Sequence, residues 1–281
     1  MMTNLTAINS SNPILLLGCG KMGSAMLSGW LKEGLSSDAI YIVDPFLDNI
    51  RQEFDVINQT QLHVKLDSLP KDLKPSFVIA AVKPQMMDDA LEAVKALDLT
   101  SSVILSIAAG KTIGYFEDQL GQECAIIRAM PNTPAAIGKG ITVCVANDPV
   151  NDQQKAISTL LLETVSIVEW IDDESLMDAV TALSGSGPAY VFYLSEAMSA
   201  AGKALGLPTE LSKKLARQTI AGSGALLEIS DERASKLREN VTSPGGTTAA
   251  ALDVLMSEDG LAKIIRRAMT EAKNRSKELA K

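Results

Sequence analysis

Three glycines separate an apolar stretch from a helical pattern in PILLLGCGKMGSAMLSGWL, residues 13–31. Gly18, Gly20 and Gly23 have the G-x-G-x-x-G spacing of a dinucleotide site. The first allows a tight turn, the second lets the backbone approach a pyrophosphate, and the third lets helix and strand pack closely. A helix starting near Lys21 would direct free N–H groups and its positive dipole end at that pyrophosphate. These four residues predict a nicotinamide dinucleotide site, and the alternative is a glycine turn that binds nothing.

Asp44 closes the next apolar stretch, 21 residues after Gly23. A carboxylate at this position accepts hydrogen bonds from a ribose and repels a 2′-phosphate, so Asp44 mildly favours NADH over NADPH. The alternative is that Asp44 only ends a strand ahead of Pro45. No arginine follows it directly, and both NADPH and NADH stay open as the cofactor.

The chain offers few groups that could act as a general acid. Its only histidine, His63, stands inside an expected strand and is predicted to be structural. Reduction of a ketone requires an acid that protonates the developing alkoxide. A protonated imine needs no such acid, because its carbon already attracts hydride and the product nitrogen is a neutral amine. The residues therefore fit an imine reductase that relies on positioning better than a carbonyl reductase.

Polar loops could complete the site. Lys83 in AVKPQ ends an expected strand, where it could contact a cofactor or remain a solvated lysine. RAMPNTPAAIGKG, residues 128–140, follows another strand. SGSGPAY, residues 184–190, must open or kink a helical pattern at Gly187-Pro188, for binding or for packing alone. In VTSPGGTTAAALDVL, residues 241–255, hydroxyl and N–H groups at a helix start suit a small carboxylate. A well-capped helix that binds no ligand would show the same sequence pattern.

These residues need elements to position them, and the first 170 residues alternate short apolar stretches with amphipathic ones. The expected strands cover residues 13–18, 39–44, 62–66, 76–83, 102–109, 124–130, 141–146 and 166–171. Residues 85–97 predict a helix with one apolar face, formed by Met86, Ala90, Leu91, Val94 and Leu97. Apolar strands separated by helices predict a parallel sheet covered on both faces, a doubly wound α/β fold of the Rossmann type.

After about residue 172 the strand patterns stop, and the chain is expected to be all-helical. The expected division is a flexible leader over 1–12, a dinucleotide-binding domain over 13–171 and an all-α domain over 172–281. Helices this rich in alanine and leucine predict burial of one face against a partner chain, hence a homo-oligomer, rather than an ordinary monomer core.

Composition excludes several classes of protein. The 281 residues are 46% hydrophobic and 21% charged, as in globular proteins, and a net charge of −8 argues against nucleic-acid binding. No apolar run reaches the roughly 18 residues that span a bilayer, and the polar leader is not a secretory signal. The three cysteines lack metal-ligand spacing, so no metal site is expected. We expect a cytoplasmic protein.

The motifs GCGKMGSAM, AVKPQ, SIAAG, RAMPNTPAAIGKG, SGSGPAY and VTSPGGTTAAAL occur in this order along nearly the whole chain. In these segments the sequence resembles the pyrroline-5-carboxylate reductase family. The resemblance implies a Rossmann domain followed by a helical dimerisation domain, assembled as dimers or rings of dimers. It also implies NAD(P)H-dependent reduction of 1-pyrroline-5-carboxylate to L-proline, the last step of proline biosynthesis.

The resemblance also assigns roles to residues. Cofactor contacts would come from Gly18, Gly20, Met22, Gly23, Ala81, Val82, Lys83, Pro84, Ala108 and Ala109. The substrate carboxylate and ring nitrogen would be held by Val241, Ser243, Gly245, Gly246, Thr247 and Thr248, at a dimer interface. Thr248 is expected to orient the ring.

The chain departs from many relatives at Asp44-Pro45, where they carry a small or basic pair, and at Asp67-Ser68, where they carry an asparagine. Both departures concern the choice between NADPH and NADH, not the reaction. The alternatives are a reductase of another cyclic imino acid and a non-catalytic NAD(P)H-binding regulator. A β-hydroxyacid dehydrogenase is less favoured, because Val191 stands where those enzymes carry a catalytic lysine.

Overall fold

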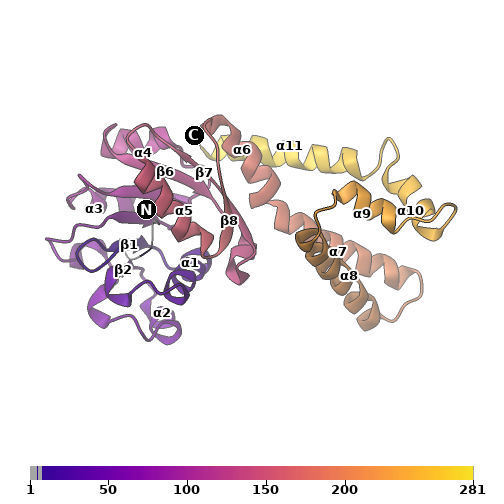
Figure 1. The fold of residues 1–281 in the computed structure, drawn as a ribbon, viewed down its shortest axis with the longest axis horizontal. Helices are drawn as coiled ribbons and strands as arrows, with labels where there is room; N and C mark the ends of the chain where they lie inside the picture. The colour runs from indigo at the N-terminus through magenta and orange to yellow at the C-terminus, as the bar shows by residue number, and fades with distance from the viewer. Residues whose placement is uncertain (1–4, 6–7, 281) are drawn as a thin grey trace. The chain divides into compact units, whose positions relative to one another are not determined.

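The computed structural model describes Leu5 and residues 8–280 and consists of two compact units (Figure 1). The first unit comprises the chain up to Gly185 together with the stretch from Lys273 onward. The second unit is Ser186–Ala272.

An eight-stranded sheet forms the centre of the first unit, in the order β3-β2-β1-β4-β5-β6-β7-β8. All eight expected strands are present in the described chain. They are β1 (Ile14–Leu17), β2 (Ile40–Val43), β3 (Leu62–His63), β4 (Phe77–Ala80), β5 (Val103–Ser106), β6 (Ala125–Met130), β7 (Gly140–Ala146) and β8 (Ser166–Trp170).

The prediction of an all-parallel sheet is wrong at one pair, because β6 and β7 run antiparallel. The connection between them holds only the short 3₁₀ turn Thr133–Ile137. A parallel neighbour needs a crossover of a dozen or more residues, usually a helix, so this short connection returns the chain in the opposite direction.

Helices cover both faces of the sheet, as the doubly wound prediction requires (Figure 1). They are α1 (Lys21–Lys32), α2 (Leu47–Glu53), α3 (Met87–Val94), α4 (Ile113–Leu120) and α5 (Asp152–Glu163). Side chains from α1, α2 and α5 share one core with Ile14 and Leu16, and those from α3 and α4 share the other with Leu15 and Leu17. The apolar face predicted for residues 85–97 is wrong at Met86, which is exposed; Met87 is buried in its place.

The domain limits differ from the expected ones at two places. Leu5 and Ile8 are buried in the first core, so the leader is anchored at these two side chains, whereas residues 9–12 are exposed. The remaining leader residues, 1–4 and 6–7, lie outside the described residues. At the other limit, Met177 is fully buried in the second core, which places the division after Gly185 and not at residue 171.

Beyond β8 the described chain is helical, as predicted. It continues through α6 (Met177–Val180), a π-helical turn (Thr181–Gly185), α7 (Gly187–Ala204), α8 (Thr209–Ile229), α9 (Ala234–Asn240), α10 (Thr247–Leu255) and α11 (Leu261–Leu279). The helical break expected at Gly187-Pro188 is confirmed. None of the described helices is both long and apolar enough to span a membrane.

The second unit has almost no core of its own. Its buried side chains within the described chain are Ser212 and Ala216, whereas large apolar side chains such as Phe192, Tyr193 and Val254 are 63%, 70% and 70% exposed. Such extensive apolar exposure is typical of a surface that pairs with another chain.

Candidate active site

The three fingerprint glycines have different surroundings. Gly18 has φ +87°, and a Cβ there would lie 2.9 Å from the carbonyl oxygen of Ala81. A Cβ at Gly23 would lie 2.4 Å from the carbonyl oxygen of Gly18. Gly20, by contrast, would meet nothing within 4 Å. Two glycines therefore permit close packing, and the third leaves open space beside the backbone, where a pyrophosphate fits.

Helix α1 begins at Lys21, as predicted, and its N-cap Gly20 supplies no capping side chain. The N-cap residue therefore provides no side-chain acceptor for the first N–H groups of the helix. This terminus suits an anion, because unpaired N–H groups and the helix dipole act together there.

Three of the predicted cofactor segments lie together at the carboxyl-terminal ends of the strands. Strands β1, β4 and β5 are parallel neighbours, and the glycine loop, Ala81–Pro84 and Ala108–Ala109 follow their carboxyl ends. The N–H of Ala81 donates to the carbonyl of Leu17, and the N–H of Ile107 donates to that of Ala80, at 2.9 and 3.1 Å. Ligands of doubly wound sheets bind outside the carboxyl ends of the strands, so this end of the sheet is the candidate cofactor site.

A cavity of about 430 Å³ lies next to this site, at the carboxyl ends of β1, β2 and β4. Leu17, Val43, Pro45, Val64 and Val82 are among its lining residues. An apolar cavity of this kind suits a flat aromatic ring such as adenine. The described residues thus fit a dinucleotide, with open space for the pyrophosphate and an apolar cavity next to it.

Asp44 is 9% exposed and holds the glycine loop. Its Oδ2 accepts a hydrogen bond from the N–H of Cys19 at 2.7 Å, and its Oδ1 accepts one from the N–H of Phe46 at 2.8 Å. The carboxylate therefore joins the end of β2 to the turn that follows β1. Each carboxylate oxygen has room for more than one hydrogen bond, so this structural role does not preclude a ribose contact.

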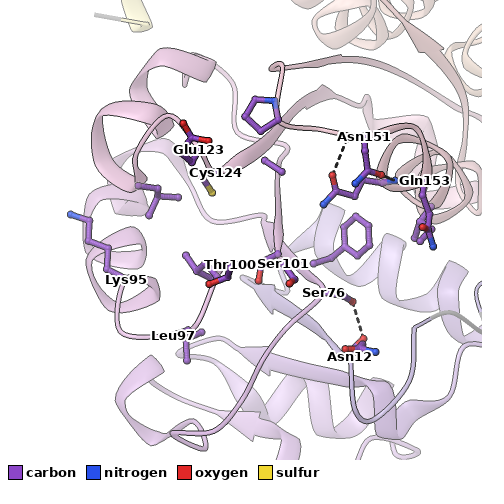
Figure 2. A pocket seen from close by; sticks show the side chains of 18 of the residues that line it. Asn12, Ser76, Lys95, Leu97, Thr100, Ser101, Glu123, Cys124, Asn151 and Gln153 are labelled. Carbon is purple, nitrogen blue, oxygen red and sulfur yellow. Dashed lines mark hydrogen bonds between the residues drawn. The ribbon is translucent and has the colours of Figure 1, made fainter.

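A larger hollow, of about 900 Å³, lies at the opposite, amino-terminal ends of the strands (Figure 2). Ser76, Ser102 and Cys124 line it, next to the amino ends of β4, β5 and β6. Some of its polar groups bond within the protein: Ser76 Oγ donates to the carbonyl of Asn12 at 2.8 Å. This hollow is not the predicted site, because the glycine loop is at the other ends of the strands.

Two of the sequence motifs meet in the first unit. Asn132 in the MPNTP loop donates from Nδ2 to the carbonyl of Ser184 at 3.2 Å, and its Oδ1 accepts from the N–H of Ile141 at 3.0 Å. A Cβ at Gly185 would lie 2.4 Å from the terminal carbon of Met130. The asparagine side chain thus fastens the loop after β6 to the π-helical turn.

The predicted substrate residues lie in the second unit, whereas the predicted cofactor residues lie in the first. Gly245 has φ +69°, and a Cβ at Gly246 would lie 2.4 Å from the Ser243 hydroxyl. Thr247 and Thr248 open α10, and no side chain caps this helix at Gly246. The first N–H groups of α10 therefore receive no hydrogen bond from an N-cap side chain, and this terminus suits an anion.

Neither His63 nor the cysteines resemble reactive groups. His63 Nδ1 lies 2.9 Å from Ser68 Oγ, and its Nε2 lies 3.1 Å from the carbonyl oxygen of Thr60, consistent with a structural role. Burial raises the pKa of the Cys19 thiol to about 11 and that of Cys144 to about 12. Thiols with such pKa values are protonated and weakly nucleophilic at neutral pH. No group of three potential metal ligands occurs among the described residues.

Sequence reasoning missed the ion pair between Arg128 on β6 and Glu174. Arg128 is 4% exposed, and the two side chains approach to 2.7 Å. The signal was a charged residue inside the apolar stretch CAIIRAM, because a buried guanidinium requires a partner. The partner itself stands 46 residues further on, beyond any periodic pattern.

Together, a glycine-loop sheet domain and a helical unit with exposed apolar side chains define a dinucleotide-dependent oxidoreductase that assembles through its helices. Residues 13–110 match the family profile "NADP oxidoreductase coenzyme F420-dependent", and residues 174–279 match "Pyrroline-5-carboxylate reductase dimerisation". The chain belongs to the pyrroline-5-carboxylate reductase family.

Individual relatives agree with this membership. The chain is 35% identical to the pyrroline-5-carboxylate reductase of Pseudomonas aeruginosa over 96% of its own length and 98% of the relative. It also matches the structure of a pyrroline-5-carboxylate reductase from Coxiella burnetii, with 33% identity, a TM-score of 0.87 and coverage of 96% and 99%. The Plasmodium falciparum pyrroline carboxylate reductase with NADP bound gives 30% identity, a TM-score of 0.81 and coverage of 97% and 100%.

Proposed function

We propose that this protein reduces 1-pyrroline-5-carboxylate to L-proline with NAD(P)H, the last step of proline biosynthesis, in the cytoplasm. The observation that carries the proposal is family membership across both units, at 35% identity over 96% of the chain. The open glycine loop and the adjoining apolar cavity support it, because they suit the pyrophosphate and the adenine of a dinucleotide.

Bound NAD(P)H would supply the hydride. Gly20 and the N-terminus of α1 would hold the pyrophosphate, and Val82 and Pro45 would contact the adenine. The other proposed cofactor contacts are Gly18, Lys21, Met22, Gly23, Asp44, Ala81, Lys83, Pro84, Ala108 and Ala109. Asp44 would give a slight preference for NADH, because its carboxylate repels a 2′-phosphate.

The proposed substrate site is the start of α10. Its uncapped N–H groups and the hydroxyl groups of Ser243 and Thr247 suit the substrate carboxylate, and Thr248 would orient the ring. Val241, Gly245 and Gly246 would complete this loop. We assign no general acid, since an already protonated imine accepts hydride without a further proton transfer.

We further propose that the exposed apolar helices of the second unit pair two chains, and that dimers assemble into rings. The substrate loop would then lie at the dimer interface, so a complete site would require two chains.

The experiment that tests the reaction measures oxidation of NADH and NADPH, by loss of the reduced-nicotinamide absorbance, with pyrroline-5-carboxylate present. We expect turnover that yields proline. Cofactor binding without turnover would contradict the proposal, and other cyclic imino acids would then be tested before a regulatory role is considered.

A further inference from the structure

One partly buried ion pair reaches the loop that carries Ala108 and Ala109. Arg128 Nη1 donates to Glu174 Oε1 at 2.7 Å, and the Arg128 side chain is only 5% exposed. The same carboxylate oxygen accepts a hydrogen bond from the backbone N–H of Ile113 at 2.9 Å. Ile113 is the first residue of α4, so Glu174 holds the end of the loop 107–112.

The end of α11 passes close to this loop near its middle. Gly110 has φ +79°, and a Cβ there would lie 3.0 Å from the carbonyl oxygen of Leu279. The end of α11 is in turn fastened within the first unit, because Ser276 Oγ donates to Asp178 Oδ1 at 2.7 Å. The loop is therefore hydrogen-bonded to Glu174 at its end, and the end of α11 passes close to it at Gly110.

The two segments that approach this loop have a common property. Glu174 belongs to the stretch that leads into the second unit at Ser186, and Leu279 belongs to the stretch that returns from that unit after Ala272. The stretch that leads into the helical unit thus bonds the end of this loop, and the stretch that returns from that unit lies close to its middle.

We propose that Glu174, held by Arg128, is a positioning residue for hydride transfer. It fixes the loop 107–112 so that Ala108 and Ala109 seat the nicotinamide ring at the distance that transfer requires. This role rests on the proposed function. Because a misplacement of about 1 Å in a reacting pair costs on the order of a hundredfold in rate, loss of the carboxylate should lower kcat far more than it weakens cofactor binding.

The test compares Glu174→Ala, Glu174→Gln and the control Asp172→Asn, which removes a charge from an exposed position two residues away. Glu174→Gln keeps the oxygen that accepts from Ile113. We expect Glu174→Ala to lower kcat by about tenfold to a hundredfold, with the Kd of NAD(P)H changed by less than about threefold. Glu174→Gln should keep kcat within about threefold of wild type because it keeps that acceptor, and the control should match wild type.

Amide hydrogen exchange over residues 107–120 supplies a readout that does not depend on turnover. Exchange at Ile113 should become at least about tenfold faster in Glu174→Ala and stay near the wild-type rate in Glu174→Gln. Where Glu174→Ala fails to fold because Arg128 is left unpaired, the double variant Arg128→Met/Glu174→Ala removes both charges and still lacks the acceptor.

Unchanged exchange in the alanine variants would overturn the proposal, and so would faster exchange with an unchanged kcat. Equal losses of kcat and of cofactor affinity, or equal losses in the glutamine and alanine variants, would also overturn it. If the wild-type protein itself gave no proline, the proposed reaction would fail separately, and the exchange rates would still decide whether Glu174 holds the loop.

Discussion

At the scale of single residues, Asp44 combines two requirements in one carboxylate. Both of its oxygens accept backbone N–H groups, from Cys19 and Phe46, and this bracing keeps the glycine loop against β2. The negative charge that suits these donors also disfavours a cofactor phosphate nearby. Stability of the loop and choice of cofactor are therefore linked at this position.

Replacing Asp44 by serine should raise the ratio of kcat/KM for NADPH to that for NADH by about tenfold, because the repelling charge is removed. The absolute kcat/KM with both cofactors should fall, since the buried hydrogen bond from the N–H of Cys19 in the glycine loop is lost. Steady-state kinetics with each cofactor measures both effects, with the exposed Asp48→Asn as control. A constant ratio would assign Asp44 to the structure alone.

Thr248→Ala should lower kcat/KM for pyrroline-5-carboxylate by about tenfold, the loss expected for one well-placed hydrogen bond to the substrate. The Kd of NAD(P)H should stay the same, because the proposed cofactor residues lie in the other unit. Fluorescence titration of the cofactor and initial-rate kinetics provide the two measurements, with the exposed Thr100→Ala as control. A parallel loss of both affinities would indicate a disturbed assembly instead.

At the scale of elements, much of the first unit could be predicted. The eight strands and the start of α1 at Lys21 follow from apolar stretches and glycine spacing, which are local signals. The direction of β7 could have been inferred only from the length of its connection, and the parallel expectation missed it. The contact of Glu174 with Arg128 and Ile113 depends on distant segments meeting in space, which no periodic pattern records.

Two glycine variants in the glycine loop separate an effect on fold stability from an effect on cofactor binding. Gly20→Ala should leave the melting temperature unchanged, because a Cβ there meets nothing within 4 Å, yet it should weaken NAD(P)H binding at least about tenfold by filling the pyrophosphate space. Gly18→Ala should destabilise the fold by about 1–2 kcal/mol or more, from its positive φ and its contact with Ala81.

Thermal unfolding and cofactor titration distinguish the two glycine variants. The control is Gly114→Ala in α4, where the nearest atom to an added Cβ is 4.0 Å away and no cofactor contact is proposed. Cofactor binding by Gly20→Ala at wild-type strength would place the pyrophosphate elsewhere.

At the scale of the whole molecule, the helical unit depends on a partner for burial. Because Phe192, Tyr193 and Val254 are largely exposed in one chain, the proposed pairing of chains would supply the apolar contacts that the unit lacks internally. Sequence composition predicted this need for a partner, but not which helices meet.

Phe192→Glu should produce a monomer, because it places a charge on the apolar surface proposed to pair. The monomer should retain NAD(P)H binding through its first unit and lose turnover of pyrroline-5-carboxylate. Light scattering after size-exclusion chromatography, cofactor titration and kinetics measure the three properties. Ile167→Glu, at a 67% exposed position of β8 in the first unit, is the control and should remain oligomeric.

The first unit is discontinuous along the chain, since residues from Lys273 onward rejoin it after the helical unit. On the ribosome, segments emerge in order, so α11 is synthesised only after the rest of the helical unit. The close approach of Leu279 to Gly110 can therefore form only once the helical unit has been translated. The loop that carries Ala108 and Ala109 thus reaches its final packing at the end of synthesis, long after the residues of the glycine loop have been made.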